Sequence, residues 1–240
     1  GSTGKKLARA LIAAIAALAV VILGTRFMAP APTAEPVKAE VANAAAPAQA
    51  ANSIAVLPFV DMSPIKDQEY FSDGISEELL NSLAQVEGLQ VAGRTSSFAF
   101  KGQNKDLREI GEILNVSNIL EGSVRKAGDQ VRITAQLIKA ADGYHLWSKT
   151  YDRELKDIFA VQDEIAGSIV AEMSPHLPGA KETKVKSAAR TELAAYDRFL
   201  LAREKMTQDG SKAAYEAAAA LLDGAIAEDP KYAPALAWRA

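Results

Sequence analysis

Three runs of strand-forming residues in the segment 120–151 place the tightest constraint on the fold. Two turn signals separate them, Ala127-Gly128-Asp129 and Asp142-Gly143. Apolar residues of the middle run alternate with polar ones: Val131, Ile133, Ala135 and Leu137 with Arg132, Thr134 and Gln136. This period of two places one face on a core and the other in water. Asp-Gly favours a tight hairpin, because turn residues must accept positive φ. The segment therefore predicts a three-stranded antiparallel meander.

Helix and strand patterns flank the meander on both sides. Apolar runs at 54–59 and 89–95 predict two further strands. A helix with Phe71 on its apolar stripe is expected to start near Ser72 or Asp73 and to end at Gly88. A second helix is capped by Asp106 and ends at Asn115, and a third starts near Asp157. The predicted order is β-α-β-α-β-β-β-α, an α/β (α+β) sandwich with helices packed on one sheet.

The N-terminal segment contains an apolar stretch without charge between Arg9 and Arg26. A membrane-spanning helix needs about 17–25 such residues. We expect a transmembrane helix at 10–26, with 1–9 as a cytoplasmic flank, because Lys5, Lys6 and Arg9 precede it. A cleaved signal peptide and a buried Ala-rich helix are the alternatives. The chain begins at Gly1 and not at methionine, which favours the anchor. Residues 27–240 would then lie on the periplasmic side of the inner membrane.

Two linkers and an all-helical region complete the expected domain plan. Residues 27–52 are mostly Ala, Pro, Val and Glu, and cannot bury enough surface to offset their ordering entropy. A domain at 53–177 follows, and then a Pro- and Lys-containing linker at 178–191. The region 192–240 is predicted to form helices at 195–206 and 213–228 and to begin another at Tyr232. We expect this region to continue in a longer protein.

The composition argues against several kinds of active site. There is no cysteine and there are only two histidines, so cysteine nucleophiles, thiolate zinc sites and imidazole-rich metal sites are unexpected. Neither the phosphate-binding Gly-x-x-x-x-Gly-Lys pattern nor the Gly-x-Ser-x-Gly elbow occurs. The net charge of −3 gives no reason to expect a nucleic-acid partner. We expect no catalytic residue, cofactor or metal, although a small sensed ligand remains an alternative.

Two clusters of polar residues have both a functional and a structural explanation. Asp73, Glu77 and Glu78 could form an acid/base or metal site, but acidic side chains also belong at a helix start, which is the explanation that we favour. His145 and Trp147 are expected on one strand face, where they could form an aromatic binding spot or simply pack.

Further polar residues are expected to be structural or solvated. Arg94-Thr95-Ser96-Ser97 has hydroxyls and a charge but lacks the glycine-rich loop of a phosphate site. His176 is expected to be solvated. The second linker contributes basic residues that could touch a membrane surface or remain in water: Lys181, Lys184, Lys186 and Arg190.

The C-terminal helices resemble a tetratricopeptide repeat. Ala218, Leu222, Ala225 and Pro230 match the small-large-small-proline spacing of that family, although the first helix places Tyr196 too far upstream for a standard repeat length. Small residues in this pattern let paired helices approach closely, and a pair needs neighbours to bury its open face. The resemblance implies a surface that binds protein partners.

The middle domain resembles the TolB N-terminal-like domain of membrane-bound bacterial signalling proteins. The segments that carry the resemblance are IAVLPF at 54–59, YFSDGISEELLNSL at 70–83, LQVAGRTSS at 89–97 and the meander. In that family one membrane span joins the domain to a cytoplasmic winged-helix or class III nucleotide cyclase module. The resemblance implies a non-catalytic, membrane-anchored extracytoplasmic interaction or sensor module. Whether the larger protein is a cyclase or a transcription regulator stays open.

Overall fold

The computed structural model describes residues 50–177, 191–208 and 210–240. The predicted transmembrane segment 10–26, nearly all of the first linker and the basic residues of the second linker lie outside these ranges. Within them, no helix is both long and apolar enough to cross a bilayer. Pro47–Ala240 forms one compact unit.

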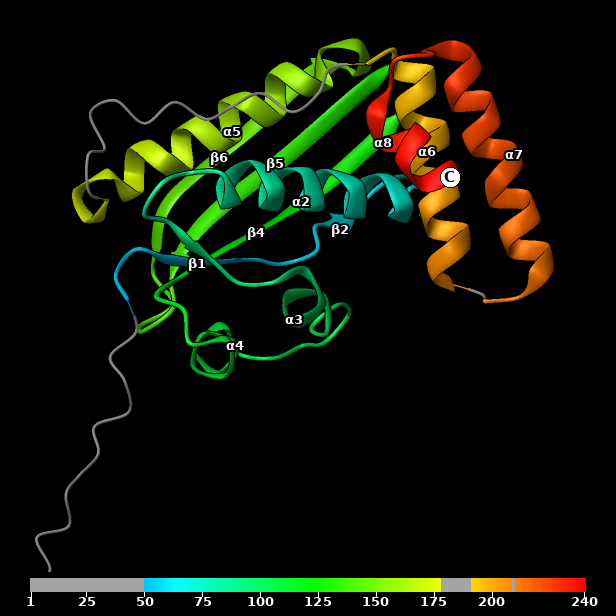
Figure 1. The fold of residues 1–240 in the computed structure, drawn as a ribbon. Coiled ribbons are helices and arrows are strands. Elements are labelled where there is room, and N and C mark those ends of the chain that lie inside the picture. The colour runs from blue at the N-terminus through cyan, green and yellow to red at the C-terminus, as the bar shows by residue number, and fades with distance from the viewer. Residues whose placement is uncertain (1–49, 178–190, 209) are drawn as a thin grey trace, which may run out of the picture. The chain divides into compact units, whose positions relative to one another are not determined.

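A mixed sheet of six strands forms the centre of the described unit (Figure 1). Its strands are β1 (Ser53–Val56), β2 (Val60–Asp61), β3 (Gln90–Val91), β4 (Asn118–Ala127), β5 (Gln130–Lys139) and β6 (His145–Glu154). The order is β3-β1-β4-β5-β6, with β2 also beside β4. β4, β5 and β6 form the predicted antiparallel meander. β1 pairs in parallel with β3 and β4, and β2 pairs in parallel with β4. The expected α/β class is confirmed.

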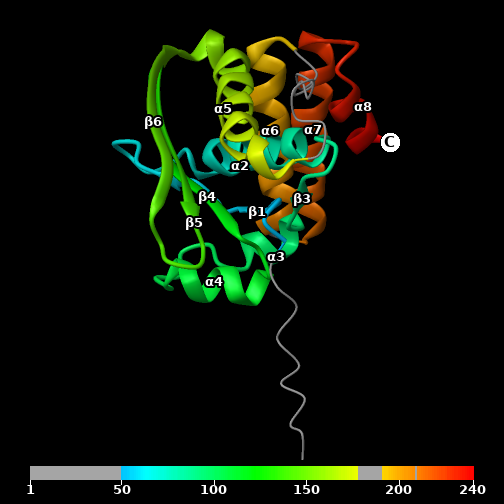
Figure 2. The same cartoon turned by 90° about the vertical axis from the view of Figure 1, so that its left-hand side faces the viewer.

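Helices lie on both faces of the sheet. Ile54 and Val56 of β1 belong to the main core, which includes residues of α2 (Glu69–Ala84) and α5 (Ile158–Met173). The alternate residues, Ala55 and Leu57, belong to a smaller core with α4 (Leu107–Leu114). Figure 2 shows α2 and α5 on one side of the meander. In the described ranges no helix covers its other side over β5 and β6, which places the polar side chains of β5 toward water.

Three C-terminal helices pack against this α/β domain: α6 (Leu193–Gln208), α7 (Lys212–Glu228) and α8 (Ala233–Arg239). α6 contacts α2 directly, and α7 packs on α6. Tyr196 and Phe199 of α6 share the core of α2 and α5. Leu222 of α7 is buried, as its spacing predicts. The main hydrophobic core is therefore continuous from the sheet into the helices.

Local signals at two helix ends are confirmed. The side chain of Asp106 accepts a hydrogen bond from the Arg108 N–H and caps α4. Asn115 ends α4 in the left-handed region at φ 51°. The predicted start of the third helix is also confirmed, since α5 follows directly on Asp157.

Other boundaries differ from the prediction. The expected strand at 89–95 is only two residues long, because the N–H groups of Ser96 and Ser97 bond back to the Gly93 carbonyl and start α3 (Arg94–Phe98). Ser72 and Asp73 do not cap α2, which begins at Glu69. The reason is non-local, since the Gln68 N–H that precedes α2 donates to the Asp61 carboxylate of β2. α2 also ends four residues before Gly88.

Candidate functional site

Charged side chains converge where α2 of the α/β domain meets α6, a contact that we call the seam. Glu77 of α2 is at its centre. Its Oε2 accepts from Arg94 Nε at 2.5 Å and also pairs with the guanidinium of Arg203 on α6. The side chains of Glu77 and Arg203 are only 16% and 11% exposed. Such burial leaves the ion pair little screened by salt. Each charge therefore needs the other to offset the cost of its removal from water.

Arg203 also contacts two aromatic rings. Its guanidinium carbon lies 5.5 Å from the ring centre of Phe199 and 5.6 Å from that of Trp238 on α8. A guanidinium at this distance is attracted to the ring faces. Arg203 therefore links three helices: α2 by charge, α6 through its own backbone, and α8 through Trp238.

A second ionic group lies on the neighbouring turn of α2. Lys101 Nζ pairs with Asp73 Oδ2 and with Glu69 Oε1, each at 2.6 Å. The other oxygen of Asp73, Oδ1, is buried and has no hydrogen-bond partner among the described residues. Burial raises the pKa of the Asp73 carboxyl, and the bond from Lys101 opposes that rise only in part.

A third group ties the start of α2 to α6 and β4. Asp197 Oδ1 accepts from Tyr70 Oη at 2.9 Å and from Lys126 Nζ at 3.1 Å. The Lys126 ammonium also lies 4.8 Å from the ring centre of Phe71. Burial and the Asp197 charge raise the pKa of the Tyr70 hydroxyl.

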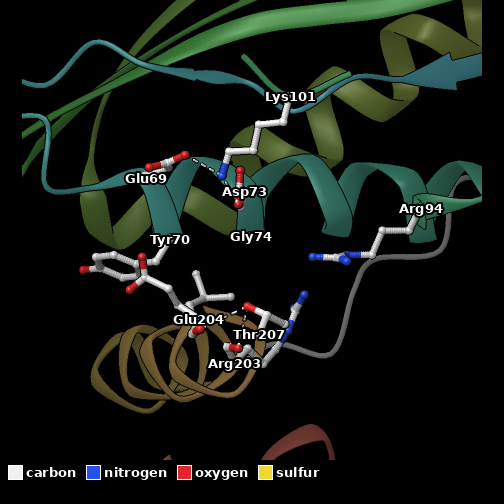
Figure 3. Close-up of a pocket in the computed structure, with 10 residues that line it drawn as sticks. Glu69, Tyr70, Asp73, Gly74, Arg94, Lys101, Arg203, Glu204 and Thr207 are labelled. Carbon is white, nitrogen blue, oxygen red and sulfur yellow. Dashed lines mark hydrogen bonds and ion pairs between the residues drawn. The ribbon is translucent and has the colours of Figure 1, made fainter. Parts of the chain in front are cut away.

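A partly open cavity of about 280 Å³ lies at the seam (Figure 3). Its lining comes from α2, α3, the loop after α3 and α6: Glu69, Tyr70, Asp73, Gly74, Arg94, Lys101, Leu200, Arg203, Glu204 and Thr207. In Figure 3, α6 faces α2 across this space, and Arg94 points into it from the opposite end to Tyr70. Gly74 allows the close approach, because a Cβ there would lie 2.6 Å from both methyl carbons of Leu200.

Glu78 lies on the adjoining part of the seam. A cavity of about 510 Å³ there is lined by Glu78, Trp238 and other residues of α2, α6 and α8. Burial raises the pKa of the Glu78 carboxyl, although Arg203 lowers it and Glu77 adds to the rise. The Glu78 charge in turn adds to the raised pKa of the buried hydroxyl of Tyr196, for which burial itself is the larger cause.

The three acidic residues that the sequence groups together do lie close along α2, but not at its start. Asp73, Glu77 and Glu78 lie in the middle of α2 because that helix begins at Glu69. Two of them form ion pairs with Lys101, Arg94 and Arg203. The described ranges contain no group of three or more His, Cys, Asp and Glu side chains placed to hold a metal ion.

The predicted pairing of His145 and Trp147 on one strand face is wrong. Trp147 lies opposite Leu137 and His145 lies opposite Ile138, with a β-bulge between them. Residues opposite one another share a face, and Leu137 and Ile138 point to opposite faces. The extra residue, Leu146, therefore separates the two side chains. Trp147 packs on the main core, whereas His145 is exposed.

The remaining sequence candidates take structural positions. Arg94 joins the seam and stacks on Phe98, with 4.3 Å from its guanidinium carbon to the ring centre, while Ser97 is buried. His176 is exposed in a short 3-10 turn after α5. The basic linker residues Lys181, Lys184, Lys186 and Arg190 lie outside the described ranges.

Side chains on the polar face of the meander form hydrogen-bonded pairs across β5 and β6. Thr134 and Thr150 share a hydrogen bond at 3.1 Å between their hydroxyls, and Arg132 Nε donates to Asp152 Oδ1 at 2.5 Å. These side chains bind one another across β5 and β6. The face is open to a partner, but it is not a cluster of reactive groups.

Sequence reasoning missed Arg203, Lys101 and Asp197. One signal was available for Arg203: it follows Phe199 by four positions and Tyr196 by seven, so it continues the apolar stripe of α6. A charged residue on such a stripe needs a buried partner. The seam offers both carboxylates and cationic side chains to a charged ligand or partner, because both kinds line its cavity.

Comparisons with known proteins place the chain in a family. A protein of Rhizobium meliloti (strain 1021) named "Putative adenylate cyclase 3" is 44% identical over 165 residues, 69% of this chain and 28% of that protein. The chain thus spans little more than a quarter of that relative. One similar solved structure is the lipoprotein GNA1162 of Neisseria meningitidis, with 18% identity over 51% of this chain and 96% of that chain and a TM-score of 0.38. Another is TolB of Acinetobacter baumannii, with 12% identity over 51% of this chain and 28% of that chain and a TM-score of 0.40.

The family model described as "HilA/YgeH-like transcriptional regulator, second domain" matches residues 49–168, which is half of the chain and includes every strand of the sheet together with α2 to α4 and most of α5. The chain therefore belongs to the HilA/YgeH-like transcriptional regulator second-domain family.

Proposed function

We propose that this chain is a non-catalytic accessory module of a larger bacterial signalling protein whose output domain is a class III nucleotide cyclase. The observation that carries this proposal is the 44% identity to the Rhizobium relative over 165 residues. That identity covers most of this chain but only 28% of the relative, so the relative has ample length outside the match for a separate catalytic domain.

The geometry supports an interaction role for the module. Helices α6 to α8 are joined to the α/β domain by a shared core and by the ion pairs of the seam, so a partner bound to the helices acts on the whole unit. Tyr215, Leu236 and Trp238 on α7 and α8 are 43–49% exposed. Exposed Tyr and Trp side chains are favoured at protein interfaces. We infer that the helices are a tetratricopeptide-type surface for protein partners.

A membrane anchor at 10–26 is part of the same proposal. It would hold the described unit on the periplasmic side and the output domain in the cytoplasm, following the positive charges at Lys5, Lys6 and Arg9. Alkaline phosphatase fused after residue 52 is expected to be active in intact bacteria, whereas a fusion after Lys6 is expected to be inactive. The reverse pattern would contradict the proposed orientation.

The cyclase connection is tested with the full-length protein. Cyclic AMP formation from ATP is measured for the full-length protein, for a version that lacks residues 50–240, and for this chain alone. We expect activity in the first two and none in the third. A regulator with a winged-helix output domain is the second candidate, favoured by the description of the matched family. Specific DNA binding by the full-length protein, without cyclase activity, would establish that alternative.

A further inference from the structure

We propose that the seam cavity binds a small zwitterion of the free α-amino acid class, with its carboxylate held by Arg94 and its ammonium group held by Asp73. The inference rests on the geometry of the described residues and does not depend on the nature of the output domain. It would make the module a sensor of a small molecule in addition to a protein-binding surface.

The size of the cavity suits such a molecule. Its volume of about 280 Å³ is just below the usual range of ligand pockets, about 300–1,000 Å³, so only a small molecule fits it. Tyr70, Gly74 and Leu200 give the lining an apolar part, and Thr207 adds a hydroxyl. A small polar molecule with a short apolar side chain fits this mixture better than a nucleotide or a lipid does.

The charges around the cavity are balanced in sign. Three cationic side chains line it, Arg94, Lys101 and Arg203, and so do three carboxylates, Glu69, Asp73 and Glu204. A ligand with one charge gains attraction from half of these groups and repulsion from the other half. A ligand with two opposite charges a few bonds apart pairs with both kinds, so the lining selects a zwitterion over a simple anion or cation.

One buried atom without a partner supports the same ligand. Among the described residues, Asp73 Oδ1 is a buried acceptor without a donor, and the Asp73 side chain lines the cavity. An unmet buried group of this kind is costly, and more so when it is charged. Rotation of the Asp73 carboxylate about its soft terminal torsion would turn Oδ1 toward an incoming ammonium group.

The α2–α6 contact gives binding a physical consequence. The proposed ligand would contact α2 through Asp73, the start of α3 through Arg94 and, in the same cavity, the α6 side chains Leu200 and Thr207. Binding to this arrangement of the helices would stabilise it by mass action, because the lining of the cavity comes from both α2 and α6.

The experiment measures the thermal unfolding of the full chain with each of the twenty amino acids at about 5 mM, followed by calorimetric titration of any amino acid that raises the melting temperature. The N-acetyl derivative, which keeps only the negative charge, and the carboxamide, which keeps only the positive charge, are titrated in parallel. We expect at least one amino acid to bind, and both derivatives to bind at least roughly tenfold more weakly, since each loses one charge-assisted contact.

Two cavity variants and one matched control complete the test. Asp73→Asn and Arg94→Gln are each expected to weaken binding by roughly tenfold or more. Asp152→Asn removes the acid of an ion pair on the far polar face of the sheet and should leave binding unchanged. The proposal is overturned if no amino acid binds, if the single-charge derivatives bind equally well, or if folded cavity variants bind like the wild type. If a cavity variant does not fold, the derivative series on the wild-type chain decides alone.

Discussion

Replacing Arg203 with glutamine tests whether the seam holds the helices on the α/β domain. The substitution removes the charge that pairs with Glu77 and the guanidinium that contacts Phe199 and Trp238. It keeps a polar side chain of related length in the same helix, so loss of helix propensity is a minor effect.

The expected loss follows from burial. Removing one partner of a buried ion pair costs about 3–5 kcal/mol, because the other charge is left in a poorly solvated place. Glu77 still forms its ion pair with Arg94, whose side chain is 39% exposed. This remaining pair offsets part of the loss. The lost aromatic contacts add roughly 0.5–1 kcal/mol each. We expect the Arg203→Gln variant to lose about 3 kcal/mol of unfolding free energy.

Urea denaturation of the unit from Pro47 to Ala240, followed by tryptophan fluorescence and circular dichroism, measures this loss. Arg132→Gln is the matched control, since its pair with Asp152 is exposed on both sides and should contribute less than about 1 kcal/mol. The double variant with Glu77→Gln should lose less than the sum of the two single losses. An Arg203→Gln loss within about 0.5 kcal/mol of the control would refute this reasoning.

Three further predictions concern local features. Gly74→Ala should lose about 1–3 kcal/mol in urea denaturation because its new methyl meets Leu200, and adding Leu200→Ala should make the combined loss less than additive. Asn115→Ala should lose about 1 kcal/mol in thermal unfolding, whereas Asn115→Gly should be tolerated, because the residue has φ 51°. The pKa of Glu78 is raised in the folded state, so its contribution to stability is present below its ordinary pKa of 4.5 and is lost as the pH rises through the folded value. Glu78→Gln should therefore reduce the fall of the urea midpoint with rising pH, and an unchanged pH profile would contradict that sign.

The meander could be predicted because its signals are local. The alternation in β5 and the glycines of the two turns act within a few residues, and Gly128 and Gly143 do adopt positive φ, at 58° and 76°. The same holds for the cap of α4 at Asp106 and for its end at Asn115. Each of these features depends on the backbone preference of one residue or on a short apolar period.

The seam could not be predicted because its contacts are remote in sequence. Glu77 and Arg203 are 126 positions apart, and Asp197 reaches back to Tyr70 and Lys126. Even the start of α2 depends on Asp61, a residue of an earlier strand. The bulge at Leu146, which separates His145 from Trp147, likewise has no turn residue to signal it. The sequence does point to Asp73, Glu77 and Arg94, and the charged residue on the apolar stripe of α6 is a further local hint, but no local signal pairs these residues with one another.

Cyclic AMP formation by the full-length protein tests the proposed accessory role most directly. Three proteins are compared at equal concentration: the full-length wild type, the full-length Arg203→Gln variant, and this chain alone. We expect no product from the chain alone, product from the wild type, and a changed rate in the variant, whose output domain is intact but whose seam is weakened. Product from the chain alone, or no cyclase activity in the full-length protein, would contradict the proposal.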